Sequence, residues 1–174
     1  MKKITCENST SKLDVSLKKA AEHCHRHGSK LTLKRKQVLS ILIDAGKAIS
    51  AYELIDLFES ICEQKIPPMS AYRILDYLVS VDLVHKINLA NKFVACAHIG
   101  CKSHHEISQL LFCQQCQRVE EVPVNSFIYK SFKDEINNFG YQLDSQQIEL
   151  GCICNACSSD NVTSNKNFPA LTQG

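Results

Sequence analysis

Two pairs of cysteines constrain the fold of this chain more than any other feature. Cys113-Gln-Gln-Cys116 and Cys154-Asn-Ala-Cys157 are C-x₂-C units separated by 37 residues. Each such turn places two thiolates at zinc–sulfur distance from one ion, and two turns complete a tetrahedron. We therefore predict a structural zinc site made of Cys113, Cys116, Cys154 and Cys157. Cys152 is a rival ligand, because Cys152-Ile-Cys154 is a second close pair.

The start of the chain indicates which cysteine chemistry to expect. The first ten residues, MKKITCENST, are basic at their beginning but have no apolar stretch behind it, unlike a secretory signal. We therefore expect a cytoplasmic protein, in which cysteine clusters bind metal more often than they form disulfides. No apolar run approaches the roughly 20 residues of a transmembrane helix. A cysteine–zinc redox sensor is the alternative use of the same thiols.

The first half of the chain has the periodicity of helices. Apolar residues keep helical spacing in four segments, and Ser50-x-x-Glu53 is a capping box that predicts a helix start. Pro67-Pro68 is expected to break the chain before the fourth helix. His23, His25 and His27 are spaced two apart, so we expect exposed cations at a helix end rather than one shared face.

The pattern changes after residue 82. Residues 83–87 and 92–96 are short β-rich runs on either side of a turn, which predicts a hairpin. Helices followed by a hairpin are the order of a winged-helix DNA-binding domain. Beyond it, a strand is predicted at 109–112, a helix at 125–139 and a strand at 146–150. The predicted fold class is α+β: an N-terminal winged-helix domain followed by a small α/β domain with structural zinc.

Four regions follow from these patterns. The winged-helix domain takes residues 1–84, with its wing continuing to about residue 96. Residues 85–108 are a hinge and a second metal-binding region, and residues 109–157 are the C-terminal domain. Residues 158–174 are polar and aperiodic, and we expect a disordered tail there.

Metal-binding side chains also gather between the two predicted domains. Nine nitrogen, sulfur and oxygen donors lie between residues 85 and 121, enough for a second tetrahedral site. Ligands at a domain junction would couple metal affinity to domain orientation. The nine donors are His85, Cys96, His98, Cys101, His104, His105, Glu106, Glu120 and Glu121. A zinc hydrolase would use Glu120 or Glu121 as a base, but no H-E-x-x-H or H-x-E…P-C-x-x-C signature is present, so we expect no enzyme.

Basic residues are concentrated at two helix starts, although the net charge is only +2. Lys34 and Arg35 enter the second helix together, and Arg73 follows Tyr72 in the first turn of the fourth. A helix N-terminus favours phosphate, and arginine can read guanine through two hydrogen bonds. These residues predict contact with double-stranded DNA, with an ordinary solvated surface as the alternative.

Taken in order, the motifs resemble the ferric uptake regulator family over roughly residues 15–157. The motifs are Leu31-Thr-Leu-Lys-Arg35, Ser70-Ala-Tyr-Arg73, Val84-His85-Lys86, the His104-His105 pair and the two C-x₂-C units. Residues 49–57 and 71–78 are similar to the zinc uptake regulator subgroup in particular.

The resemblance implies a homodimeric, zinc-dependent transcriptional repressor with two zinc ions per chain, in which residues 109–157 are the dimerisation domain. Such a repressor binds AT-rich palindromic operators of zinc-uptake genes and has no small-molecule substrate. The implied regulatory ligands are His85, Cys96, His105 and Glu121, with His104, Glu106 and Cys101 as rivals. The implied DNA contacts are Tyr52, Tyr72 and Arg73, beside Lys34 and Arg35. A thiolate such as Cys96 favours zinc over ferrous iron, which is lower in the affinity order. An iron- or peroxide-responsive member of the family is the alternative.

Overall fold

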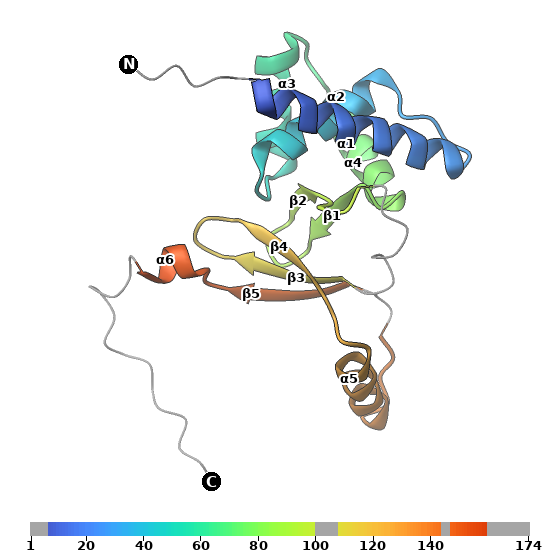
Figure 1. Cartoon of the computed structure of the whole chain (residues 1–174), viewed down its shortest axis with the longest axis vertical. Helices are drawn as coiled ribbons and strands as arrows, with labels where there is room; N and C mark the ends of the chain where they lie inside the picture. Colours follow the sequence, from blue (N-terminus) through green and yellow to red (C-terminus); the bar gives the residue numbers. More distant parts are fainter. Residues whose placement is uncertain (1–6, 100–107, 144–146, 160–174) are drawn as a thin grey trace.

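A computed structural model describes residues 7–99, 108–143 and 147–159 (Figure 1). The first part consists of α1 (Glu7–Arg26), α2 (Leu33–Ala45), α3 (Ala51–Cys62), α4 (Pro68–Ser80), β1 (Val84–Ile87) and β2 (Lys92–Ala95). The second part consists of β3 (Ser108–Cys113), β4 (Val119–Pro123), α5 (Ser126–Asn138), β5 (Gln147–Cys152) and α6 (Asn155–Ser159). None of the helices in these residues is long and apolar enough to cross a membrane. The predicted α+β class is confirmed.

Local sequence signals account for where the helices begin. At α3 the capping box is confirmed: Ser50 Oγ accepts from Glu53 N at 3.1 Å, and Glu53 Oε2 accepts from Ser50 N at 2.7 Å. Pro68 does not precede α4 but opens it, because its fixed φ suits the first helical position and its missing N–H is not needed there. The fully buried side chains of Leu39, Phe58 and Leu75 pack the helices around one core.

The β1–β2 hairpin has two buried faces, because alternate residues of a strand point to opposite sides. Val84 and Phe93 face the helices and belong to their core. Ile87 and Val94 face the other way and pack against Leu110 of β3. The hairpin therefore lies between the helices and the second sheet, as Figure 1 shows. We call its contact with the β3–β4–β5 sheet the seam.

The second sheet has the order β4-β3-β5, with β3 antiparallel to β4 and parallel to β5. The predicted β-α-β order was therefore incomplete, because β4 was missed. Its sequence, Val-Glu-Glu-Val-Pro, does not alternate between apolar and polar residues, so period-two analysis cannot find it. The observed order places Glu121 in a strand, β4, which lies between the strand predicted at 109–112 and the helix predicted at 125–139. The predicted tail lies outside the described residues, except for the end of α6.

Polar contacts reinforce the seam beside its apolar cluster. Gln117, which follows the turn after β3, accepts a hydrogen bond from Ala48 N at 3.0 Å through its backbone oxygen. Its side-chain oxygen accepts from Lys92 Nζ at 2.6 Å, and Lys92 also donates to Glu53 Oε2 at 3.0 Å. This bridge joins the turn after β3 to the first turn of α3. The hydrogen bonds from Ser50 N and from Lys92 lower the pKa of Glu53 to about 2.

His23 corrects the expectation of three exposed histidines. It is 7% exposed, its Nε2 lies 2.9 Å from Val81 O, and its ring centroid lies 4.5 Å from that of His27. The two rings meet because residues four apart share a helix face. Burial is the main cause that lowers the pKa of His23, followed by the charges of His27 and Arg26. The hydrogen bond with Val81 O and the charge of Asp82 raise the pKa, but by less.

The lowered pKa of His23 predicts a pH-dependent stability. Between the folded and unfolded pKa values the unfolded chain binds more protons, so stability rises with pH. We expect the melting temperature to fall as the pH drops below about 6.5. His23→Gln keeps a donor for Val81 O but cannot ionise, so its melting temperature should change less between pH 8 and pH 5.5. His25→Gln, at an exposed site, is the control, and equal pH dependence in all three proteins would contradict the assignment.

Candidate metal centres

The four cysteines of the two C-x₂-C units meet at one edge of the sheet. Because β3 and β5 are parallel neighbours, their carboxyl ends lie side by side, with Cys113 in register with Cys152. The turn after β3 brings Cys116 back towards Cys113, and the start of α6 brings Cys157 towards Cys154. The ligand atoms of all four lie within 4.8 Å of one another. This arrangement is the one predicted from the cysteine spacing.

The sulfur positions match a zinc tetrahedron rather than disulfides. Cys116 Sγ and Cys154 Sγ are 3.7 Å apart. Two sulfurs at 2.3 Å from a tetrahedral zinc ion lie about 3.8 Å apart, whereas a disulfide requires about 2.05 Å. Cys152 does not belong to the group: its thiol contacts Phe112 O at 3.5 Å.

The protein stabilises one thiolate of this cluster without a cation. Backbone N–H groups of Cys116 and Cys154 lower the pKa of Cys113 to about 6. By contrast, the Cys154 thiol and then burial raise the pKa of Cys157 to about 12. Closely spaced thiolates repel one another, so the full set ionises only when a cation is shared among them. The four donors therefore fit a structural zinc ion.

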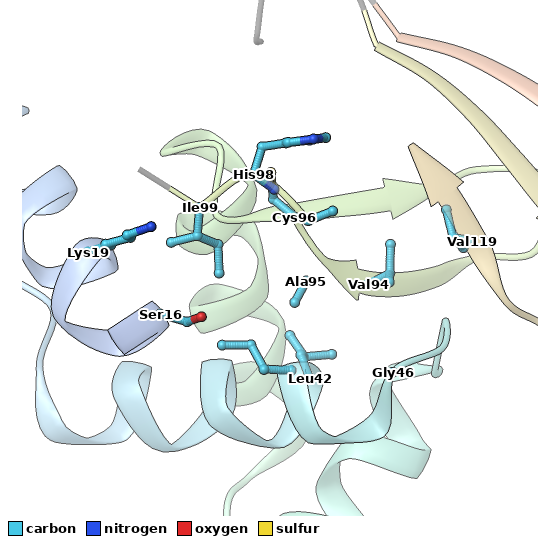
Figure 2. Close-up of a pocket in the computed structure, with 12 residues that line it drawn as sticks. Ser16, Lys19, Leu42, Gly46, Val94, Ala95, Cys96, His98, Ile99 and Val119 are labelled. Atoms are coloured by element: carbon cyan, nitrogen blue, oxygen red, sulfur yellow. Dashed lines mark hydrogen bonds between the residues drawn. The ribbon is translucent and has the colours of Figure 1, made fainter. Parts of the chain in front are cut away.

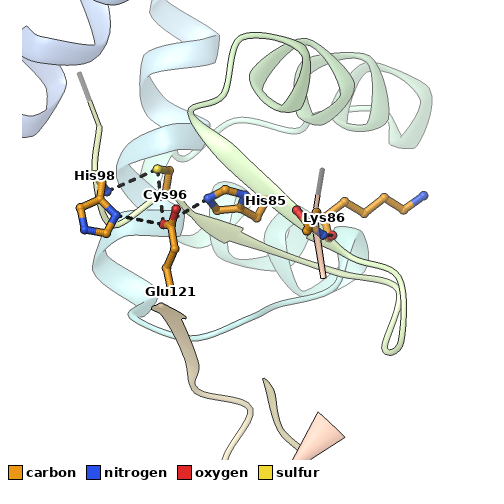
Figure 3. Close-up of polar contacts among 6 residues, drawn as sticks. His85, Lys86, Cys96, His98 and Glu121 are labelled. Atoms are coloured by element: carbon orange, nitrogen blue, oxygen red, sulfur yellow. Dashed lines mark hydrogen bonds and ion pairs between the residues drawn. The ribbon is translucent and has the colours of Figure 1, made fainter. Parts of the chain in front are cut away.

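A second cluster lies at the seam and draws on both parts of the chain. His85 comes from β1 and Cys96 follows β2, while Glu121 comes from β4 on the facing sheet (Figure 3). Their ligand atoms lie within 4.8 Å of one another. Glu121 faces the hairpin because it lies opposite the buried Leu110 in the antiparallel pair, and opposite residues share a face.

The distances within the seam cluster also fit a single zinc ion. Glu121 Oε2 lies 3.3 Å from His85 Nε2 and 3.7 Å from Cys96 Sγ. Two nitrogen or oxygen ligands on tetrahedral zinc lie about 3.3–3.4 Å apart, and a sulfur–oxygen pair about 3.5 Å. His85 Nε2 is buried, and within the described residues it has the ion-pair contact with Glu121 but no hydrogen bond. A buried imidazole nitrogen that makes no hydrogen bond beside a carboxylate and a thiol is suited to bind a metal ion.

Cys96 is held as a thiol in this environment. Burial and then the charge of Glu121 raise its pKa to about 12. The thiol donates to Glu121 Oε2 and accepts from His98 N at 3.3 Å. Coordination by sulfur requires the thiolate, so uptake of a metal ion here releases a proton. Metal affinity of the seam cluster should therefore increase with pH.

A further histidine, His98, lies beside the three donors of the seam cluster. His98 Nδ1 lies 3.3 Å from Glu121 Oε2, on the side away from His85 in Figure 3. The other predicted candidates, Cys101, His104, His105 and Glu106, lie outside the described residues.

A cavity of about 340 Å³ borders the seam cluster from the helical side. Figure 2 shows Cys96, His98 and Val94 on one wall, with Lys19 and Ser16 of α1 among the residues opposite. A partly buried metal site needs a path by which the ion can enter. This cavity is lined by Cys96 and is large enough to hold water, so it can provide that path.

The predicted DNA contacts are not equally available at the surface. Tyr52, at the start of α3, is 66% exposed, and Arg73 and Lys34 are exposed. Tyr72 is half-buried and packs against the helical core, so only part of its side chain is available at the surface. Arg35 is already engaged: its guanidinium lies 3.3 Å from the Tyr77 ring centroid and donates to Lys30 O.

Several residues of the seam were not predicted from the sequence. Glu149 accepts hydrogen bonds from the turn of the hairpin, and Gln147 donates to Lys86 O at 2.8 Å. Burial alone would raise the pKa of Glu149, but the hydrogen bonds that it accepts lower it below its usual value. The sequence indicated only that Gln147 and Glu149 are two residues apart in a predicted strand, so that both side chains point to the same face of the sheet.

The fold and the two clusters define a class of protein: a winged-helix domain joined to a sheet with a four-cysteine site and a His-Cys-Glu site between them. The sequence model of the ferric uptake regulator family matches residues 26–151, which is most of the chain. The chain therefore belongs to the ferric uptake regulator family.

Within this family, the chain is similar to several zinc uptake regulators. The zinc uptake regulation protein of Escherichia coli (strain K12) is 31% identical over 141 residues, covering 81% of this chain and 80% of that protein. The crystal structure of holo XcZur is 29% identical with a TM-score of 0.70, covering 84% of this chain and 99% of that one. A zinc uptake regulator complexed with zinc and DNA is 28% identical with a TM-score of 0.72, covering 89% and 99%.

Proposed function

We propose that this chain is a zinc-responsive transcriptional repressor that binds AT-rich palindromic operators of zinc-uptake genes as a dimer, in the cytoplasm. The observation that carries the proposal is the seam cluster, because it combines ligands from the hairpin with a ligand from the facing sheet. Its relatives include a zinc uptake regulator complexed with zinc and DNA. The protein acts by binding rather than by catalysis.

The seam explains how a metal ion can control DNA binding. When bound, zinc supplies a shared cation for the three donors. His85 and Cys96 can share an ion with Glu121 only while the hairpin is docked on the sheet. Docking sets the position of α3 and α4 relative to the second domain, and so to a partner copy. Two recognition helices must be about 34–36 Å apart to read adjacent half-sites.

Two zinc sites per chain have different roles in this proposal. Cys113, Cys116, Cys154 and Cys157 hold a structural ion, since this cage leaves no open position. His85, Cys96 and Glu121 hold the regulatory ion. His105 is the fourth regulatory ligand by family resemblance, with His104, Glu106 and Cys101 as rivals, and the position of His98 beside Glu121 adds it to these rivals.

An exposed apolar surface on α5 supports the homodimer. Helix α5 has no buried residues, and three of its apolar side chains, Phe127, Ile128 and Phe132, are exposed in the single chain. Ile128 is 62% exposed and Phe132, four residues later, is 48% exposed, and β5 is an edge strand of the sheet that the described residues form. Exposed apolar residues of this size at helical spacing favour contact with a second copy. The second domain is then the dimerisation domain.

Tyr52, Tyr72, Arg73, Lys34 and Arg35 are proposed to contact the DNA. Arg73 and Tyr52 are the best placed, because they are exposed: Tyr52 in the first turn of α3, and Arg73 in the second turn of α4, which begins at Pro68 rather than near Ser70. Exposed Lys34 is suited to phosphate, whereas Tyr72 offers only the part of its ring and hydroxyl that the core leaves open. Arg35 can contact phosphate only from its position over Tyr77.

Titrating DNA binding against buffered free zinc tests the proposal. The protein should contain two zinc ions per chain when saturated, and removal of the weaker ion should reduce affinity for an AT-rich palindrome by on the order of 10- to 100-fold. DNA binding that is the same with one zinc ion and with two would refute the switch. Equal activation by Fe²⁺ would instead favour the iron-responsive alternative. Loss of one zinc together with reversible thiol oxidation would favour the redox alternative.

A further inference from the structure

A second carboxylate, that of Glu149, accepts hydrogen bonds from the hairpin at the end opposite the seam cluster. Glu149 Oε1 accepts from Asn88 N at 3.0 Å and from Asn88 Nδ2 at 2.8 Å. Its Oε2 accepts from Leu89 N at 3.0 Å. The backbone amides of the hairpin turn therefore point at one carboxylate of the other domain. Gln147 completes the contact by donating both to Glu149 Oε1 and to Lys86 O, each at 2.8 Å.

Glu149 and Glu121 belong to one row of the sheet. Leu110 is in register with Glu121 on β4 and with Glu149 on β5. Residues in register share a face, and neighbouring strands are about 4.8 Å apart, so the two glutamates lie about 9–10 Å from each other along the row. Leu110, which is fully buried, packs against Ile87 and Val94 between them. The row thus meets the base of the hairpin at Glu121, its middle at Leu110 and its turn at Glu149.

We propose that Glu149 is a positioning residue that docks the hairpin without metal and thereby sets the zinc affinity of the seam cluster. This inference rests on the proposed function, because it assigns a control element to the same regulatory site. Glu149 touches none of the three donors, so it acts on zinc only through the docked arrangement. The apparent dissociation constant of such a site is the intrinsic constant divided by the docked fraction.

The proposal predicts a particular pattern for Glu149→Gln. The amide keeps the shape of the side chain but has one oxygen and no charge, so it cannot accept all three hairpin hydrogen bonds. The docked fraction falls, and the seam zinc affinity falls with it by on the order of tenfold. Saturating zinc restores docking, so maximal DNA affinity should return to the wild-type value. A variant that had lost a ligand would not recover in this way.

Zinc titration against a competing chelator and amide hydrogen exchange test the proposal in the full-length protein. The control is Glu120→Gln, which removes the same charge from an exposed position on the opposite face of the sheet. Glu149→Gln should weaken seam zinc binding and speed exchange of the Asn88 and Leu89 amides, and the control should do neither. Zinc in the four-cysteine site should be retained by both variants.

The two readouts separate this proposal from the proposed function. If DNA binding by the wild-type protein does not depend on zinc, the proposed function is wrong. The amide exchange still decides whether Glu149 docks the hairpin in that case. If Asn88 and Leu89 exchange at the wild-type rate in Glu149→Gln, the docking role is overturned whatever the DNA result. Faster exchange with unchanged seam zinc affinity overturns the control of zinc binding.

Discussion

Replacing Cys113 with serine is expected to unfold the second domain while leaving the helices of the first domain intact. Cys113 is 2% exposed, and it is the thiol that the backbone amides of Cys116 and Cys154 favour as a thiolate. Structural zinc sites contribute about 10–16 kcal/mol in small zinc-binding peptides, which exceeds most of the stability of a typical domain. The helical core around Phe58 contains none of the four cysteines, so it does not depend on this ion.

Zinc analysis and circular dichroism test this expectation. Zinc content should fall by about one ion per chain. The signal of the second sheet and the dimer should be lost, and the helical signal of α1–α4 should remain while that of α5 and α6 is lost. Cys152→Ser is the matched control, because Cys152 lies in register with Cys113 but outside the cluster. A Cys152→Ser protein that lost zinc as Cys113→Ser did would make Cys152 a ligand and overturn the assigned set.

The four-cysteine site was predictable because its signal is local. Each C-x₂-C unit specifies a turn that can hold two thiolates, whatever the chain does between the units. That Cys113 and Cys154 come together then follows from the parallel pairing of β3 with β5. Similarly, the capping box at Ser50 depends on a partner three residues away, and it was predicted correctly.

The seam was only partly predictable because its contacts are long-range. His85, Cys96 and Glu121 were among nine candidate donors, but selecting them requires knowing that β4 pairs with β3, and β4 had no periodic signal. Glu149 binds backbone amides 60 and 61 residues away, and a backbone amide has no sequence signature.

The prediction that His23 is exposed was wrong for a different reason. Its four-residue spacing from His27 was visible in the sequence, but its burial depends on Val81 at the end of α4. A helix face can be read from spacing, whereas the element that covers that face is a tertiary property.

Replacing Cys96 with serine is expected to remove the zinc response without unfolding the protein. Cys96 is the softest donor at the seam, and a serine hydroxyl, which stays protonated, is a poor zinc ligand. The hairpin remains docked through Leu110 and Glu149, neither of which contacts the Cys96 side chain. Zinc content should fall from two ions per chain to about one. At saturating zinc, affinity for the palindrome should fall by on the order of 10- to 100-fold.

Cys24→Ser controls for the loss of a buried thiol, since Cys24 is fully buried in the helical core and belongs to neither proposed ligand set. The same zinc assay applied to alanine variants of the five candidates identifies the fourth ligand, because only the true ligand should reproduce the Cys96→Ser result; the candidates are His98, Cys101, His104, His105 and Glu106. Retention of both zinc ions and of zinc-dependent DNA binding in Cys96→Ser would contradict a thiolate ligand at the seam. The preference for zinc over ferrous iron would then lose its physical basis, because the remaining donors, His85 and Glu121, supply only nitrogen and oxygen.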